Sequence, residues 1–168
     1  MKTKCILFVL VVLFFSTLPL SAQDIQTVEI KEIVFQWEIV NDDIIIILSA
    51  PTKGWIAVGF EPSRMMKDAD ILIGYVKDGE TFMEDHYGSG NTKHQADLDL
   101  GGTNDITIIG GSELNDITML NFSIPLHSLD SNDRILEKGE EYKLIFAYGK
   151  RDDFKSYHKV RTSMMLTL

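Results

Sequence analysis

The chain has 168 residues and a formal net charge of -9, with 45% hydrophobic and 24% charged residues. Its length suits one ordinary domain with a single core. The acidic balance excludes nucleic acid as an expected partner, because phosphate binding requires clustered Lys and Arg. A negative surface promotes solubility outside the cell and would also suit a basic partner protein.

The N-terminus has the pattern of a secretory signal peptide. Two lysines precede an apolar run over residues 6–15, and small residues end the stretch at Ala22. The run is too short for a membrane span, which needs about 20 apolar residues. We therefore predict a signal peptide over 1–22, a single domain over 23–168 without a transmembrane segment, and an exported protein that is periplasmic or extracellular. The only cysteine, Cys5, falls within the signal and leaves no disulfide.

Beyond the signal, apolar residues come in short runs separated by Gly, Asn and Asp, a pattern typical of an all-β sandwich. The turn at 41–43 predicts a hairpin, and the β-branched run at 44–48 suits a strand buried on both faces. The sequence KDGE at 77–80 predicts a second hairpin turn. The expected strands are 28–30, 33–40, 44–48, 54–60, 71–76, 81–86, 106–110, 117–124 and 142–148, and only 126–129 and 134–137 suit a helical turn.

The polar, glycine-rich segment 88–104 interrupts this tight spacing and predicts a long loop. Asp97 and Asp99 lie within it and Asp105 follows it, so calcium binding through carboxylate oxygens is one interpretation. Their spacing does not match the twelve-residue calcium loop. Ordinary turn chemistry is the alternative.

Several motifs together resemble those of the DOMON domain family. They are GWIAVGF at 54–60, MKDAD at 66–70, ILIGYV at 71–76, and the Gly-Gly and Asn-Asp pairs at 101–105. The chain is also similar to the family near its end, where Ala-Tyr at 147–148 is followed by the His-x-x-Arg spacing of 158–161. The resemblance extends over about residues 30–168. It implies an immunoglobulin-like antiparallel β-sandwich of the DOMON type.

The resemblance also implies a cofactor, because the family includes carriers of haem b. Its haem-binding members hold the iron between a methionine and a later histidine, and Met66 and His158 occupy these places. Met65 is the adjacent rival, although a shift of one residue along an extended chain turns a side chain to the opposite face. The chain has no Cys-x-x-Cys-His motif, so a bound haem would be non-covalent. A Met/His pair fills both axial positions, which suits electron transfer rather than oxygen activation.

A porphyrin pocket also requires apolar walls and a few cationic or hydroxyl groups for the propionates. The candidates are Trp55, Phe60, Tyr75, Tyr157 and Arg161. Trp55 and Phe60 are equally interpretable as core residues of the sandwich. Arg161 is placed to bind a propionate through paired hydrogen bonds, and simple exposure to solvent is its alternative.

The remaining histidines, His86, His94 and His127, are predicted to be surface residues. His86 and His94 would be compatible with zinc or copper if they met, but they have no recognisable ligand spacing. Asp70 precedes an apolar strand, and the expectation for it is a hydrogen bond to turn backbone.

No motif for hydrolysis or phosphate binding is present, so the sequence predicts an electron carrier or a binding module rather than an enzyme. Many relatives are fused to an enzyme or a membrane cytochrome, whereas here we expect the redox partner to be a separate protein. Two alternatives remain open. One is a haem-free module that binds a sugar or another small ligand through Trp55, Tyr75 and the polar loop, and the other is a haem-based sensor from which Met66 dissociates.

Overall fold

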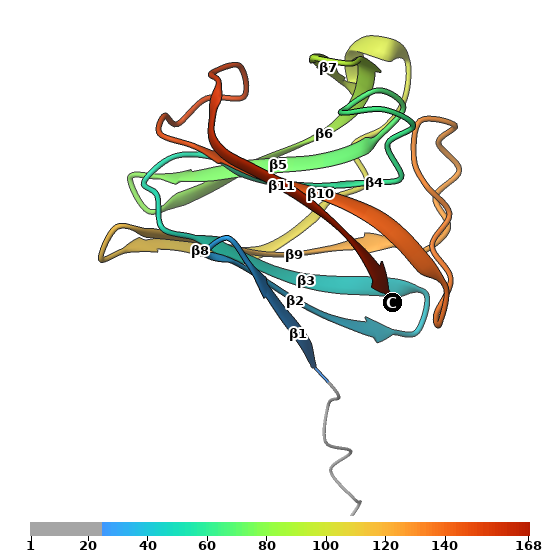
Figure 1. The fold of residues 1–168 in the computed structure, drawn as a ribbon, viewed down its shortest axis with the longest axis horizontal. Helices are drawn as coiled ribbons and strands as arrows, with labels where there is room; N and C mark the ends of the chain where they lie inside the picture. Colours follow the sequence, from blue (N-terminus) through green and yellow to red (C-terminus); the bar gives the residue numbers. More distant parts are fainter. Residues whose placement is uncertain (1–24) are drawn as a thin grey trace, which may run out of the picture.

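The computed structural model describes residues 25–168, and the predicted signal peptide lies outside them. The described chain forms two antiparallel sheets packed face to face (Figure 1), which confirms the predicted all-β sandwich. Sheet A has the order β1 (Gln26–Ile30), β2 (Ile33–Val40), β3 (Asp43–Ala50), β9 (Ile117–Pro125), β8 (Thr107–Leu114). Sheet B has the order β11 (His158–Thr167), β10 (Glu141–Gly149), β4 (Ile56–Phe60), β5 (Asp70–Lys77), β6 (Glu80–Gly90), β7 (Lys93–Ala96).

Both predicted hairpins are confirmed, and their turns use backbone conformations that their residues tolerate. Asn41, between β2 and β3, has a φ of 56°. Asp78 and Gly79, between β5 and β6, have φ values of 52° and 82°. Positive φ at the centre of a two-residue turn matches the right-handed twist of the paired strands, which explains Asn, Asp and Gly at these places.

Each sheet is completed by a pairing between strands that are distant in the sequence. In sheet A, Ile44 of β3 pairs with Ile124 of β9. In sheet B, Val58 of β4 pairs with Phe146 of β10. The central strands of both layers therefore depend on contacts between the two halves of the chain.

The main core lies between the sheets, where alternate residues of each strand point inward. Phe35, Phe122 and Phe146 are at most 1% exposed there, and burying each such side chain contributes about 1.5–3 kcal/mol. On β3, Ile44, Ile46 and Leu48 are buried, whereas the alternate residues 45 and 47 are only half-buried. The prediction that this strand is buried on both faces is therefore wrong, because no segment within residues 25–168 fully covers the outer side of sheet A.

The predicted long loop at 88–104 is wrong as well. Strand β6 continues to Gly90, β7 pairs back onto it, and the 3₁₀ helix η1 (Asp97–Leu100) follows. Residues 126–129 contain bends, and residues 134–137 have irregular backbone, instead of the expected helical turns. No helix in the described part of the chain is long and apolar enough to cross a membrane.

Candidate functional site

A second apolar cluster covers the outer face of sheet B, on the side away from sheet A. We call it the outer-face cluster. It forms because β4 is buried on both sides: Ile56, Val58 and Phe60 point into the main core, and Ala57 and Gly59 point outward. Its buried members are Trp55, Ala57, Ala69, Ile71 and Ile73, with Met66, Tyr75, Ile145, Ala147 and Phe154 packed against them.

The floor of this cluster is made of small residues. Ala57 of β4 pairs with Ala147 of β10, and Gly59 pairs with Ile145. A Cβ added at Gly59 would lie 2.8 Å from Cγ1 of Ile145, too close for an undisturbed contact. The absence of a side chain at Gly59 therefore leaves room for the side chains of Ile145 and Ile71 to pack beside it.

Met66 lies in the turn that leads into β5, at one end of this face. Its carbonyl accepts a hydrogen bond from the Ala69 amide at 3.1 Å, and its own amide donates to the Asn91 carbonyl at 3.4 Å. The Met66 side chain is half-buried and packs against the outer-face cluster. Met65 has a φ of 56° and its side chain is 43% exposed. The two methionines thus have different environments.

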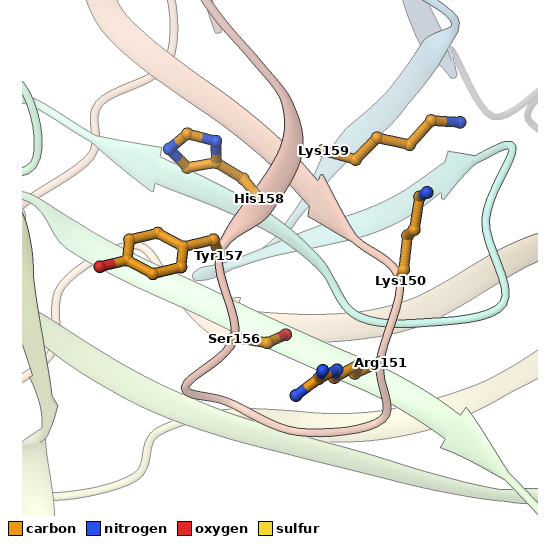
Figure 2. Close-up of a pocket in the computed structure, with 6 residues that line it drawn as sticks. All are labelled: Lys150, Arg151, Ser156, Tyr157, His158 and Lys159. Atoms are coloured by element: carbon orange, nitrogen blue, oxygen red, sulfur yellow. The ribbon is translucent and has the colours of Figure 1, made fainter.

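His158 begins β11 and pairs with Gly149 of β10. The imidazole is exposed and has no hydrogen bond, ion pair or ring contact with any residue that the structure describes. It borders a pocket of about 460 Å³ at the end of the β10–β11 loop. Figure 2 shows Tyr157 and His158 projecting to one side of this loop, with Lys150 on the other side. The lining residues are Lys150, Arg151, Ser156, Tyr157, His158 and Lys159.

Met66 and His158 lie at opposite ends of the same face. Next to Gly149, the partner of His158, Tyr148 pairs with Ile56 at the start of β4. Asp70, which follows the Met66 turn, pairs with Phe60 at the end of β4. Ile56 and Phe60 are the two ends of β4. At about 3.3 Å per residue along a strand, they are about 13 Å apart. The small-residue floor lies between them.

The other predicted pocket residues occupy different environments. Trp55 is buried in the outer-face cluster, and its Nε1 donates to Oγ of Ser156 at 3.0 Å. Phe60 is fully buried between the two sheets, so its ring lies behind the face that carries Met66. Phe60 is therefore a core residue of the sandwich and not a wall of the predicted pocket, which agrees with the alternative interpretation of this residue.

Three further candidates lie toward the rim of the same face. Tyr75 stacks on Phe82 at a ring-centroid distance of 5.2 Å and lies 5.0 Å from the ring of Phe154. Tyr157 is 96% exposed. Arg161 is exposed and lies opposite Ala147 on β11.

His86 and His94 meet, contrary to the prediction that both are surface residues. Their Nδ1 atoms are 2.7 Å apart, and Nε2 of His86 is 2.8 Å from Oε2 of Glu84. His86 is only 6% exposed, and burial lowers the pKa of His94 to about 4. The alternation of Glu84 and His86 on β6 puts both on the outer face, but no sequence pattern predicts β7, which carries His94. His127 is exposed, as predicted.

This histidine pair lines a cleft of about 860 Å³ between strands β6 and β7 and the β10–β11 loop. Tyr75 and Phe154 give the cleft an aromatic wall, and acidic side chains lie around it. The volume is within the usual range for small-ligand sites, about 300–1,000 Å³.

Buried carboxylates are the other feature that sequence reasoning missed. Asp70 accepts a hydrogen bond from the Arg134 amide at 3.1 Å, so the backbone partner expected for it comes from a distant loop. Asp85 and Asp97 are also almost fully buried. In the sequence, Asp97 suggested calcium binding only together with Asp99 and Asp105, and no motif connects Asp70 with Asp85.

The fold and this surface define an antiparallel β-sandwich with an apolar outer face bordered by polar clefts. The family model of the DOMON domain matches residues 29–149, and the chain therefore belongs to the DOMON domain family. This confirms the resemblance that the sequence motifs indicated.

Similar curated proteins are monooxygenase homologues. The chain is 28% identical over 116 residues to MOXD1 homolog 2 of Drosophila melanogaster, covering 69% of this chain and 15% of that protein. It is 30% identical over 114 residues to DBH-like monooxygenase protein 1 of Mus musculus, covering 66% of this chain and 18% of that protein. The chain thus matches less than a fifth of the length of these relatives.

Two solved structures share the fold. The cytochrome b domain of pyranose dehydrogenase from Coprinopsis cinerea superposes with a TM-score of 0.62 at 14% identity, covering 80% of this chain and 76% of that one. The cytochrome domain of cellobiose dehydrogenase from Myriococcum thermophilum gives a TM-score of 0.61 at 10% identity, covering 86% and 81%. At these identities the likeness concerns the fold alone.

Proposed function

We propose that this protein is an exported electron carrier that binds haem b non-covalently on the outer face of sheet B, with Met66 and His158 as the axial ligands. The observation that carries the proposal is their placement: Met66 packs on an apolar face whose far end holds an imidazole without a partner. When bound, the haem supplies a one-electron couple, and a thioether ligand favours the reduced iron.

The surface between the two ligands fits a flat apolar group. The floor carries the small side chains of Ala57 and Ala147, and Trp55 and Tyr75 provide aromatic walls at its edge. A planar ring standing on this floor can receive one ligand from each side. Because Met66 is only half-buried and His158 is exposed, both side chains have unused surface that a bound ring would cover.

Cationic side chains near His158 suit the propionates. Arg161 is on the same strand, and Lys150 and Arg151 line the neighbouring pocket, shown in Figure 2. An arginine can bind a carboxylate through two parallel hydrogen bonds. The hydroxyl of Tyr157 is an additional donor at this edge.

The structural neighbours support this class of function, since both are cytochrome domains by name. With Met66 and His158 both bound to iron, no coordination site remains for substrate, so we propose a non-catalytic role. The electron donor and acceptor would be separate proteins. The net charge of -9 favours a basic docking surface on that partner.

The test is the visible spectrum of the purified protein after addition of haem, before and after dithionite. We expect stoichiometric uptake and sharp α and β bands on reduction, lost in Met66→Ala and in His158→Ala. Met66→Ala should also allow the reduced iron to bind carbon monoxide. Met65→Ala is the matched control and should leave the spectrum unchanged.

Different results would change the assignment. Bands that survive both ligand substitutions but disappear in His86→Ala would transfer the site to the histidine pair. Carbon monoxide binding by the unsubstituted protein would indicate a sensor from which Met66 dissociates. An absence of stoichiometric haem uptake would exclude the electron-carrier proposal.

A second candidate, a haem-free sugar or small-ligand module, is favoured by the cleft beside β6. Tyr75 and Phe154 offer aromatic surface, and Glu84, Asp99 and Asp153 line the same space with hydrogen-bond acceptors. Sugars bind well to such a combination of ring faces and carboxylates. Saturable sugar binding that Tyr75→Ala abolishes, in a protein that takes up no haem, would establish this function.

A further inference from the structure

A group of carboxylates meets inside one end of the sandwich, on the side of sheet B opposite the outer-face cluster. Asp70 begins β5, and Asp85 lies on the neighbouring strand β6, where it pairs with Leu72 of the main core. Asp97 comes from η1, and Asp130 and Asp133 come from the loop between β9 and β10. We call these five residues the acidic cluster.

The oxygen atoms of this cluster are close together. One oxygen each from Asp70, Asp85 and Asp133 lies within 4.8 Å of the other two. One oxygen each from Asp97, Asp130 and Asp133 meets the same limit. Asp133 belongs to both groups, so the cluster is continuous.

Four of these five carboxylates, those of Asp70, Asp85, Asp97 and Asp133, have at least one buried oxygen without a hydrogen-bond partner among the described residues. Asp70 and Asp85 are each 3% exposed, and Oδ1 of each has no hydrogen-bond partner among the described residues. An orphaned carboxylate oxygen costs free energy, because it has lost water and gained nothing in exchange. Asp70 and Asp85 both belong to the first of the two close groups described above.

The protein supplies little positive charge to this place. Arg134 is adjacent. Its backbone amide donates a hydrogen bond to Asp70, but its guanidinium donates to the backbone carbonyl of Asp68. Burial, together with the neighbouring carboxylates, raises the pKa of Asp85 and of Asp133. Independently of these pKa values, carboxylates packed this closely repel one another when charged, and a bound cation would relieve that repulsion.

We propose that the acidic cluster binds Ca²⁺, with Asp70, Asp85 and Asp133 as ligands and with Asp97 and Asp130 as a second set of oxygens. Calcium takes six to eight oxygen ligands at about 2.3–2.6 Å, so oxygens on opposite sides of one ion are about 5 Å apart, close to the spacing found here. Zinc prefers nitrogen and sulfur ligands, and Mg²⁺ keeps several of its waters. Purely carboxylate ligands in a buried place favour calcium.

A bound cation would join four separate parts of the chain: β5, β6, η1 and the β9–β10 loop. Asp70 lies only four residues after Met66, and Arg134 already connects the β9–β10 loop to Asp68. Calcium at the acidic cluster would therefore also fix the turn that carries Met66. The binding itself does not depend on haem.

The experiment is calorimetric titration of Ca²⁺ into haem-free protein stripped with EDTA, together with thermal unfolding in Ca²⁺, Mg²⁺ or EDTA. We expect saturable Ca²⁺ binding and a Tm that rises with Ca²⁺ more than with Mg²⁺. Asp85→Asn and Asp133→Asn should each weaken the affinity by at least roughly tenfold, since each removes one charged ligand. Asp99→Asn, an exposed acid on the same 3₁₀ helix, is the matched control and should bind as the unchanged protein does.

A second measurement separates ligand loss from misfolding. In EDTA, Asp85→Asn should be at least as stable as the unchanged protein, because the substitution replaces a buried carboxyl group that lacks full hydrogen bonding with an amide of the same shape. A titration without heat and a Tm that does not respond to millimolar Ca²⁺ would overturn the proposal. Equal losses of affinity in Asp99→Asn and Asp85→Asn would overturn it too, because they would indicate binding at surface acids.

Discussion

His86 and His94 face each other across the β6–β7 hairpin with their Nδ1 atoms 2.7 Å apart. At that distance one nitrogen carries a proton and the other accepts it, so the pair cannot hold a positive charge on both rings without repulsion. Glu84 binds the far nitrogen of His86 and fixes that ring. The contact is therefore stable only while His94 stays neutral.

The first prediction concerns acid stability. Burial, and secondly the charge of His86, lowers the pKa of His94 from 6.5 to about 4, against an opposing effect of Glu84. Between these values the unfolded chain binds the extra proton and the folded protein does not, so stability falls as the pH falls from 6.5 toward 4. The loss due to His94 should reach at most about 3 kcal/mol.

The measurement is urea unfolding at pH 7.5 and at pH 4.5. His94→Gln should reduce the decrease between the two conditions relative to the unchanged protein. His127→Gln is the control, because that histidine is exposed and lies 2.9 Å from Glu137. An equal decrease in the His94 variant and in the unchanged protein would contradict the prediction.

The second prediction concerns Trp55. A Cβ added at Gly149 would overlap the indole of Trp55, including its Nε1. Gly149→Ala should therefore displace the ring, break its hydrogen bond to Ser156, and destabilise the protein by about 1–3 kcal/mol. A shift of tryptophan fluorescence reports the displacement. Gly110→Ala has open space around the new methyl group and should leave the fluorescence unchanged.

The third prediction compares two neighbours on β10 whose side chains lie on opposite faces of sheet B. Phe146 is 1% exposed in the main core, and Ile145 is half-buried in the outer-face cluster. Phe146→Ala should cost about 3–5 kcal/mol because it leaves a cavity between the sheets. Ile145→Ala should cost clearly less in the same urea unfolding experiment. Equal costs would show that the outer-face cluster is packed as tightly as the core.

The fourth prediction depends on the haem proposal and concerns Arg161. If this side chain binds a propionate, Arg161→Gln should weaken haem affinity by roughly tenfold while the reduced spectrum keeps its α and β bands, because a charged hydrogen bond contributes about 1.5–3 kcal/mol. The measurement is haem titration at low and high salt. Lys138→Gln, an exposed charge outside the pocket, is the control. Altered bands would instead indicate an effect on His158.

Much of the sandwich could be predicted from the sequence, because alternation and turn residues are local signals. Asn41 and the Asp78-Gly79 pair mark their turns directly. Strand β7 could not be read in this way, since its four residues, KHQA, carry no apolar alternation. The strand forms because its backbone makes hydrogen bonds to β6. Such backbone pairing does not require particular side chains, so the amino-acid sequence does not indicate it.

The candidate site was only partly predictable for the same reason. The family motifs indicated Met66 and His158 individually, and the alternation on β4 separates Ala57 from Phe60. The acidic cluster could not be predicted, because Asp70 and Asp133 are 63 positions apart in the sequence and only the folded chain brings them together. The burial of a carboxylate depends on the segments that pack against it. A short sequence motif does not indicate which segments these are.

The pairings of Ile44 with Ile124 and Val58 with Phe146 have a consequence for how the molecule is made. Contacts between such distant positions form slowly, because the chain must lose the entropy of a large loop before the strands can hydrogen-bond. The floor under Met66 exists only after β10 has docked against β4. During synthesis, the face therefore stays unformed until β10 has been made, and a ligand bound there reports that β10 has docked against β4.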